Sequence, residues 1–68
     1  MKIKIRINGK IKFVDSNQTL LKLIDNLKIP LKKVAIELNQ EIINKKKIDK
    51  VYLKKNDQIE IVHFIGGG

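Results

Sequence analysis

The last three residues of the chain, Gly66, Gly67 and Gly68, are the ones whose type and position could do chemistry. Glycine loses more backbone entropy on ordering than any other residue and adds no packing, so a terminal run of it does little for a fold. Such a run does provide a thin tether that ends in a carboxylate with no side chain nearby. We therefore expect residues 66–68 to be a flexible tail that enters the active site of another protein.

The segment that precedes the glycines supports this interpretation. Chain ends are often disordered, so glycine alone would be equally typical of a frayed terminus. Residues 59–65, however, are rich in isoleucine, valine and phenylalanine and are typical of a strong β-strand. This strand leads directly into Gly66, which predicts that the tail leaves the fold from an ordered element.

Length and composition exclude several classes of protein. Sixty-eight residues form one domain, and a chain of this size buries only about 60% of its unfolded surface, which leaves no room for a deep catalytic cleft. The sequence contains no cysteine, which excludes disulfides, thiolate nucleophiles and cysteine metal sites. No apolar run approaches the roughly 20 residues of a membrane span, and no signal peptide is recognisable. We expect a cytoplasmic protein, or one in an organelle interior such as the plastid stroma.

The net charge of +8 raises the possibility of nucleic-acid binding. Lysine supplies nearly all of this charge, with Arg6 the only arginine, and the aromatic residues are limited to Phe13, Tyr52 and Phe64. Base recognition depends on guanidinium forks and aromatic stacking, and both are scarce here. We therefore expect no specific nucleic-acid binding, although a positive surface would speed encounter with an acidic protein.

The first part of the chain predicts a β-hairpin. Residues 2–7 alternate isoleucine with lysine or arginine, which indicates a half-buried strand. Asn8 and Gly9 suit a type I′ turn, which needs positive φ at both central residues. A two-residue turn would place Ile11 and Phe13 on the face opposite the isoleucines, and a bulge or a longer loop is the alternative.

A helix is predicted next, from a change of period to one apolar residue every three or four positions. Thr19 suits the N-cap, and we expect Pro30 to end the helix by forcing Ile29 into extended geometry. The apolar stripe that should face the sheet comprises Leu20, Leu23, Ile24 and Leu27.

The rest of the chain predicts three more strands. Residues 34–38 alternate again, Asn39-Gln40 suits a turn, and 41–43 would form a short fourth strand. Residues 44–53 are irregular, with one possible helical turn, and Asn56 marks a left-handed turn before the last strand. One amphipathic helix can cover only one face of such a sheet, so the fold class is α+β in two layers.

This order resembles the β-grasp fold of ubiquitin-like proteins, a mixed sheet of four to five strands on one main helix. In its residues the chain resembles the ThiS family of sulfur carriers in thiamine biosynthesis. The similarity is carried by the opening Lys-Ile strand into Asn8-Gly9, by Thr19-Leu20, by residues 34–43 and most specifically by residues 57–68. It implies one β-grasp domain over residues 1–65 and a tail at 66–68. The family often has glycine where this chain has Gln40 and Asn56.

The resemblance also implies a mechanism. Gly68 would be adenylated and then converted to a thiocarboxylate, and Gly66 and Gly67 would keep the tail thin enough to reach the adenylating site. The activating partner would be a ThiF-type, E1-like enzyme that uses ATP and Mg, and the acceptor a ThiG-type thiazole synthase. A cysteine desulfurase is the expected kind of sulfur donor. The carrier itself would bind no cofactor or metal and would be a protein substrate, not an enzyme.

Three residues before the tail are candidates for partner docking. Val62 and Phe64 should lie on the face that the helix leaves open, unless residues 44–53 cover them. His63 should lie on the other face, in phase with Ile59 and Ile61, and a lone imidazole cannot form a metal site.

Two other functions remain open at this point. A carrier of the MoaD type, for molybdopterin or tRNA thiolation, shares the Gly-Gly end but tends to be longer. A small basic RNA-binding module of ubiquitin-like shape would explain the lysines and leave the glycines without a role.

Overall fold

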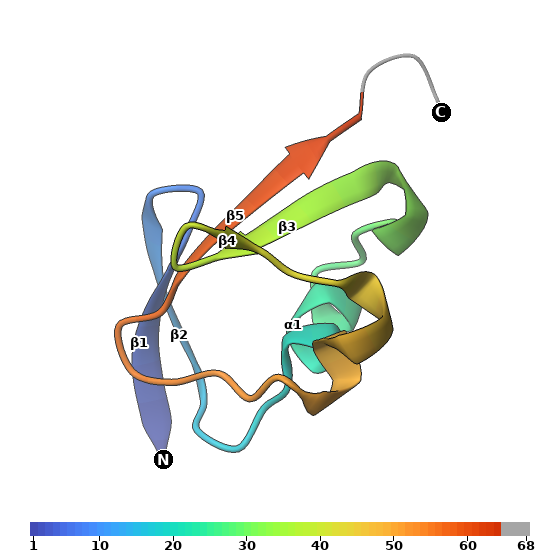
Figure 1. The fold of residues 1–68 in the computed structure, drawn as a ribbon. Helices are drawn as coiled ribbons and strands as arrows, with labels where there is room; N and C mark the ends of the chain where they lie inside the picture. Colours follow the sequence, from blue (N-terminus) through green and yellow to red (C-terminus); the bar gives the residue numbers. More distant parts are fainter. Residues whose placement is uncertain (65–68) are drawn as a thin grey trace.

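The structure is a computed structural model that describes residues 1–64; the predicted tail at 66–68 and Ile65 lie outside this range. Five strands form one mixed sheet in the order β2-β1-β5-β3-β4 (Figure 1). Strands β1 and β5 run parallel, and the other neighbours are antiparallel. The α+β prediction is therefore confirmed. The strands are β1 (Lys2–Ile7), β2 (Lys10–Asp15), β3 (Val34–Leu38), β4 (Glu41–Ile42) and β5 (Gln58–His63).

The β1-β2 hairpin has the tight turn that the sequence predicts. Asn8 and Gly9 adopt φ values of 50° and 82°, and Ile7 pairs directly with Lys10, so the register contains no bulge. Because side chains alternate along a strand, Ile11 and Phe13 then lie on the outer face of the sheet. Both are exposed, by 53% and 63% of their surface.

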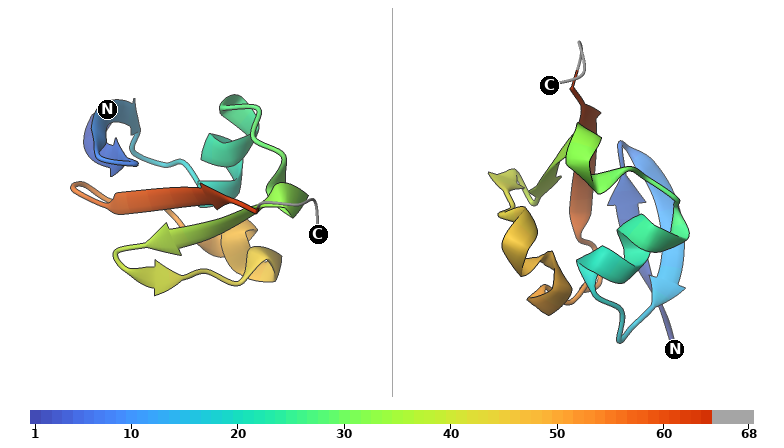
Figure 2. Two further views of the ribbon diagram at one scale, coloured as in Figure 1. Left: turned by 90° about the horizontal axis from the view of Figure 1, so that it is seen from above. Right: turned by 90° about the vertical axis from the view of Figure 1, so that its right-hand side faces the viewer.

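Helix α1 (Leu20–Asn26) packs against the opposite, inner face of the sheet. Thr19 is its N-cap, and the Thr19 hydroxyl accepts a hydrogen bond of 3.2 Å from the Lys22 backbone N–H. Figure 2 shows the sheet curving around this helix and a 3₁₀ segment, η2 (Lys45–Lys50). The buried residues come from all of these elements: Ile5, Val14, Leu20, Leu23, Ile24, Val34, Ile36, Ile48, Leu53, Ile59 and Ile61.

The helix ends earlier than Pro30 alone predicts, and for a different reason. Lys28 adopts a left-handed conformation, with φ of 57°. Its N–H donates to the Asp25 carbonyl over 3.0 Å, and the Ile29 N–H donates to the Ile24 carbonyl over 3.2 Å. These two bonds form a Schellman motif, which caps the last free carbonyls of a helix. Backbone capping at Lys28 therefore stops the helix before the proline acts.

The remaining connections are short and tightly turned. A 3₁₀ turn, η1 (Leu31–Lys33), precedes β3, and β4 is one residue shorter than predicted. Asn39, Gln40 and Asn56 all have positive φ, of 52°, 72° and 70°. Gln40 and Asn56 are the two positions where the family that the chain resembles often has glycine, which adopts this backbone at no steric cost. Within residues 1–64, no helix has the length and apolar character needed to cross a membrane.

Candidate functional site

The candidate site is the C-terminal end of β5, the strand that leads toward the glycines. This strand is the middle one of the five, between β1 and β3. It pairs with β3 from Ile59 opposite Leu38 to His63 opposite Val34. Figure 1 shows that β5 ends on the opposite side of the molecule from Met1. The end of β5 is therefore positioned by the whole sheet.

The side chain of Asn8 holds one edge of β5 beyond the point where β1 ends. Its Oδ1 accepts the Ile61 N–H over 2.7 Å, and its Nδ2 donates to the Ile61 carbonyl over 3.3 Å. The Asn8 backbone N–H donates to the Ile59 carbonyl over 2.8 Å. The amide side chain thus takes the place of a backbone peptide and extends the ladder by one step.

A second asparagine holds the start of β5 on its other edge. The Oδ1 of Asn39 accepts the Gln58 N–H over 2.9 Å, and its Nδ2 donates to the Asp57 carboxylate over 3.0 Å. The same carboxylate accepts the Lys54 N–H over 2.7 Å. Asp57 is only 7% exposed, so these bonds satisfy a buried charged group that would otherwise be costly. They fix the turn from which β5 begins.

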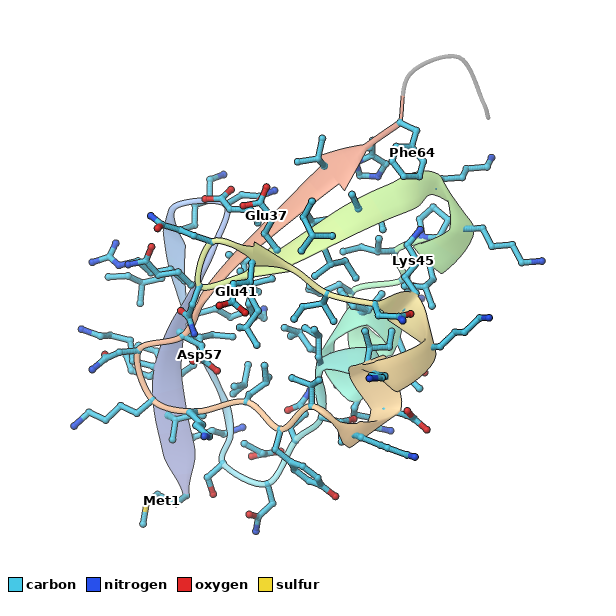
Figure 3. The ribbon with its side chains drawn as sticks, in the orientation of Figure 1. Met1, Glu37, Glu41, Lys45, Asp57 and Phe64 are labelled. Carbon is cyan, nitrogen blue, oxygen red and sulfur yellow. The ribbon has the colours of Figure 1, made fainter. Side chains whose placement is uncertain are left out.

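The last described residue, Phe64, is anchored to η1 and to η2. Its backbone N–H donates to the Lys33 carbonyl over 2.9 Å. The ammonium of Lys45 lies 5.1 Å from the centre of the Phe64 ring, within the range of a cation–π contact (Figure 3). Residues 44–53, which could have buried this ring, contact it through Lys45, and the Phe64 side chain remains 49% exposed.

The predicted docking residues do not share one face of the strand. Val62 is 54% exposed on the outer face and pairs with Ala35. His63 is also exposed, but it pairs with Val34 on the inner face. Helix α1 covers the Ile59 and Ile61 face, as predicted. The docking roles of Val62, His63 and Phe64 stay predictions, and Gly66, Gly67 and Gly68 lie outside the described residues.

Sequence patterns missed two of the residues that position this site. Asn8 and Asn39 were predicted as turn residues, which they are, but not as clamps on β5. Asn8 and Ile61 are 53 positions apart in the sequence, so the periodicity of neighbouring residues cannot predict their contact. In the part of the chain that the structure describes, His, Asp and Glu side chains form no cluster of three that could hold a metal ion.

A mixed five-stranded sheet folded around one helix, with a central last strand, defines the ubiquitin-like β-grasp class. The comparison with family models is more specific, because the ThiS family matches residues 5–68. The chain belongs to the ThiS family, the sulfur carriers of thiamine biosynthesis. This assignment favours a thiamine carrier over a molybdopterin or tRNA-thiolation carrier and over an RNA-binding module.

Individual relatives agree with the family. The chain is 40% identical to the sulfur carrier protein ThiS of Bacillus subtilis, over 94% of this chain and 98% of that protein. It is 39% identical to a thiazole synthase of Magnetococcus marinus over 97% of this chain but only 20% of that protein. The chain thus spans about a fifth of that relative. The crystal structure of ThiS from Geobacter metallireducens superimposes with a TM-score of 0.84 at 30% identity, covering 97% of this chain and all of that one.

Proposed function

We propose that this chain carries sulfur as a thiocarboxylate on Gly68 and delivers it for synthesis of the thiazole ring of thiamine. The observation that supports this most is the anchoring of β5 on both edges, up to Phe64. Gly68 is four residues beyond Phe64, and an extended chain spans at most about 3.6 Å per residue. We therefore expect the reactive carboxylate to be at most about 15 Å from a fixed point on the protein.

The chemistry requires activation, because a carboxylate is a poor electrophile. A carboxylate oxygen of Gly68 attacks the α-phosphorus of ATP, pyrophosphate leaves, and an acyl adenylate forms. Sulfide-level sulfur then attacks the acyl carbon, the bond to AMP breaks, and a thiocarboxylate results. Side chains at residues 66 and 67 would obstruct entry into the adenylating site, which explains the use of glycine.

The partners follow from this chemistry and from the relatives. We propose a ThiF-type, E1-like enzyme for adenylation, with ATP and Mg bound by that enzyme. We propose a cysteine desulfurase as the sulfur source, with a thiol that reduces its persulfide sulfur to the sulfide level and is itself oxidised to a disulfide. We propose a ThiG-type thiazole synthase as the acceptor; the support is that two thiazole synthases contain a segment 38–39% identical to this chain. In this scheme the carrier is a substrate of its partners and supplies no catalytic group.

The test uses the purified chain, a ThiF-type enzyme, MgATP and sodium sulfide. Pyrophosphate release and the intact mass report adenylation and the replacement of one oxygen by sulfur. Deleting Gly68 should abolish both signals, because it moves the carboxylate back by up to about 3.5 Å and a misplacement of about 1 Å can cost a hundredfold in rate.

Two substitutions at Gly67 test the effect of side-chain bulk on sulfuration while Gly68 and its carboxylate stay in place. Gly67→Ala should slow sulfuration mildly and Gly67→Val severely, because a β-branched side chain adds volume and restricts the backbone. The melting temperature should stay nearly constant in all tail variants, since a terminal residue contributes little to a fold. Wild-type sulfuration of the chain that lacks Gly68 would refute the proposal.

Docking near Val62 is tested by a pair of matched substitutions. Val62 and Ile11 are equally exposed, at 54% and 53%, but Ile11 lies on the far edge strand β2. Val62→Asp should raise the KM of the ThiF-type enzyme for the carrier about tenfold, while kcat changes little. Ile11→Asp should leave both constants near wild type, and equal effects of the two substitutions would contradict docking at Val62.

A further inference from the structure

The edge strand β2 offers backbone groups that no other strand uses. Within residues 1–64, β2 pairs with β1 alone. Lys4 and Arg6 of β1 direct their backbone groups toward the β5 side, where the Lys4 carbonyl accepts from Asn56 and the Arg6 N–H donates to Asp57. Their partners on β2, Phe13 and Ile11, therefore direct their N–H and C=O groups outward, away from β1. An open edge of this kind can pair with an additional strand.

A groove of about 290 Å³ lies beside this edge and is lined by residues of β1, β2 and the C-cap of α1. Its floor is apolar, because Ile7 of the inner face and Leu27 at the end of α1 form it, with Ile11 at its border. Its rim carries the ammonium-bearing side chains of Lys10 and Lys12. A strand added to β2 would place every second side chain toward this groove. The groove therefore suits apolar side chains of an extended segment that also carries negative charge.

The hairpin that forms this surface is strongly cationic. Residues 2–12 contain four lysines and Arg6 and no acidic residue. The first acid, Asp15, lies at the far end of β2 and is already paired with Lys2 at 2.9 Å. The cations along the groove thus have no acidic residue of the hairpin beside them, and an acidic ligand would complement them.

We propose that the β2 edge binds an extended segment of another protein, with alternating apolar residues and adjacent aspartates or glutamates. Backbone pairing with Ile11 and Phe13 would supply affinity, and the groove and its lysines would select the sequence. A second copy of this chain is a poor occupant, because it would bring another cationic hairpin and a net charge of +8 to the same place. Nucleic acid is also disfavoured, since Phe13 is the one aromatic side chain of the hairpin.

This surface is separate from the end of β5. Strand β1 lies between β2 and β5 in the sheet, and Val62 is three residues beyond Ile59, the last residue of β5 that pairs with β1. A segment bound to β2 would leave Val62 and Phe64 open, so the carrier could be held by one partner while its tail is in the site of another. The inference does not depend on the sulfur chemistry.

Titration with a synthetic peptide tests the proposal. The peptide alternates valine and isoleucine and ends in a run of glutamates, and a control peptide replaces the glutamates with lysines. As the peptide is added to the isotope-labelled chain, the NMR chemical shifts of the Ile11, Phe13 and Leu27 amides should change and then saturate. The chemical shift of the Val62 amide should not change. The control peptide should cause no such shifts. Shifts centred on Val62, or equal shifts with both peptides, would overturn the proposal.

Matched charge reversals test whether Lys10 and Lys12 contribute to peptide binding. Lys10→Glu with Lys12→Glu should weaken peptide binding about tenfold or more, from the loss of two charge pairs and the gain of two repulsions. Lys46→Glu with Lys47→Glu changes the net charge equally, but these residues lie on η2, away from the groove. The control should weaken binding less than threefold. Equal losses in the two variants would show that only net charge matters and would contradict the proposal.

Removal of one outward donor tests the backbone pairing itself. In Phe13→Pro the missing N–H is one that points away from β1, so the hairpin ladder keeps its bonds. Binding should fall at least tenfold while the thermal melt confirms a folded domain; should the variant unfold, Ile11→Pro removes the neighbouring outward donor. Unchanged peptide binding by a folded proline variant would refute strand addition. Shifts of the same amides with protein concentration alone, or with single-stranded RNA in place of the peptide, would also refute it.

Discussion

The hydrogen bonds between the Asn8 side chain and Ile61 of β5 predict how much stability is lost when that side chain is removed. Asn8→Gly keeps a residue that adopts φ of 50° without strain but removes the two side-chain hydrogen bonds to Ile61. The Ile61 N–H and carbonyl then lose their partners at a part-buried edge, which costs about 1–3 kcal/mol. A domain of this size has a total stability of roughly 3–10 kcal/mol. The loss should therefore be plain in a urea unfolding curve.

Two companion variants isolate the contribution of the side chain. Asn8→Ala loses the same bonds and also places a Cβ in left-handed geometry, which adds about 1–2 kcal/mol. Asn56→Gly is the matched control, since Asn56 has φ of 70° but its side chain makes no hydrogen bond within residues 1–64. The expected order of stability is wild type and Asn56→Gly together, then Asn8→Gly, then Asn8→Ala.

Hydrogen exchange at Ile61 gives a local readout of the same clamp. In the wild type its amide is bonded to Asn8 and should exchange slowly. In Asn8→Gly the Ile61 amide should lose more protection than the Ala35 amide of β3, because Ala35 faces Val62 in the β3-β5 pairing, which the substitution leaves untouched. If Asn8→Gly is no less stable than Asn56→Gly, or if Ile61 protection is unchanged, the reasoning is refuted.

Three further predictions concern the fold. Leu23→Ala should destabilise the domain by about 2–5 kcal/mol, because Leu23 is fully buried; an unchanged thermal melt would contradict this. Gln40→Gly should stabilise it by about 1 kcal/mol in urea, by relieving φ of 72°. The hydrogen bond and charge of Lys2 lower the pKa of Asp15, so the stability from this pair is present at neutral pH and lost in acid. Asp15→Asn should therefore lower the melting temperature slightly at pH 7 and not in strong acid.

Much of the fold could be predicted from the sequence because its signals are local. Alternation in residues 2–7 and the Asn8-Gly9 turn predict the hairpin. The structure then decides its register in favour of the two-residue turn, which leaves Ile11 and Phe13 exposed. Thr19 determines where the helix begins. Alternation in the last strand also separates Val62 from His63, since neighbouring side chains must point to opposite faces. The glycines at 66–68 predict a tail that enters the active site of another protein, and the resemblance to the ThiS family adds sulfur chemistry to that prediction.

Tertiary structure alone decided how the site is held. The place of β5 between β1 and β3, the clamp from Asn8 to Ile61 and the contact of Lys45 with Phe64 all join residues far apart in the chain. The end of the helix is an intermediate case: the sequence shows the proline, but the capping bonds at Lys28, two residues before it, end the helix. Periodicity reports only which face of an element is apolar. Which elements meet depends on the free energy of burying those faces together, and that quantity belongs to the folded chain as a whole.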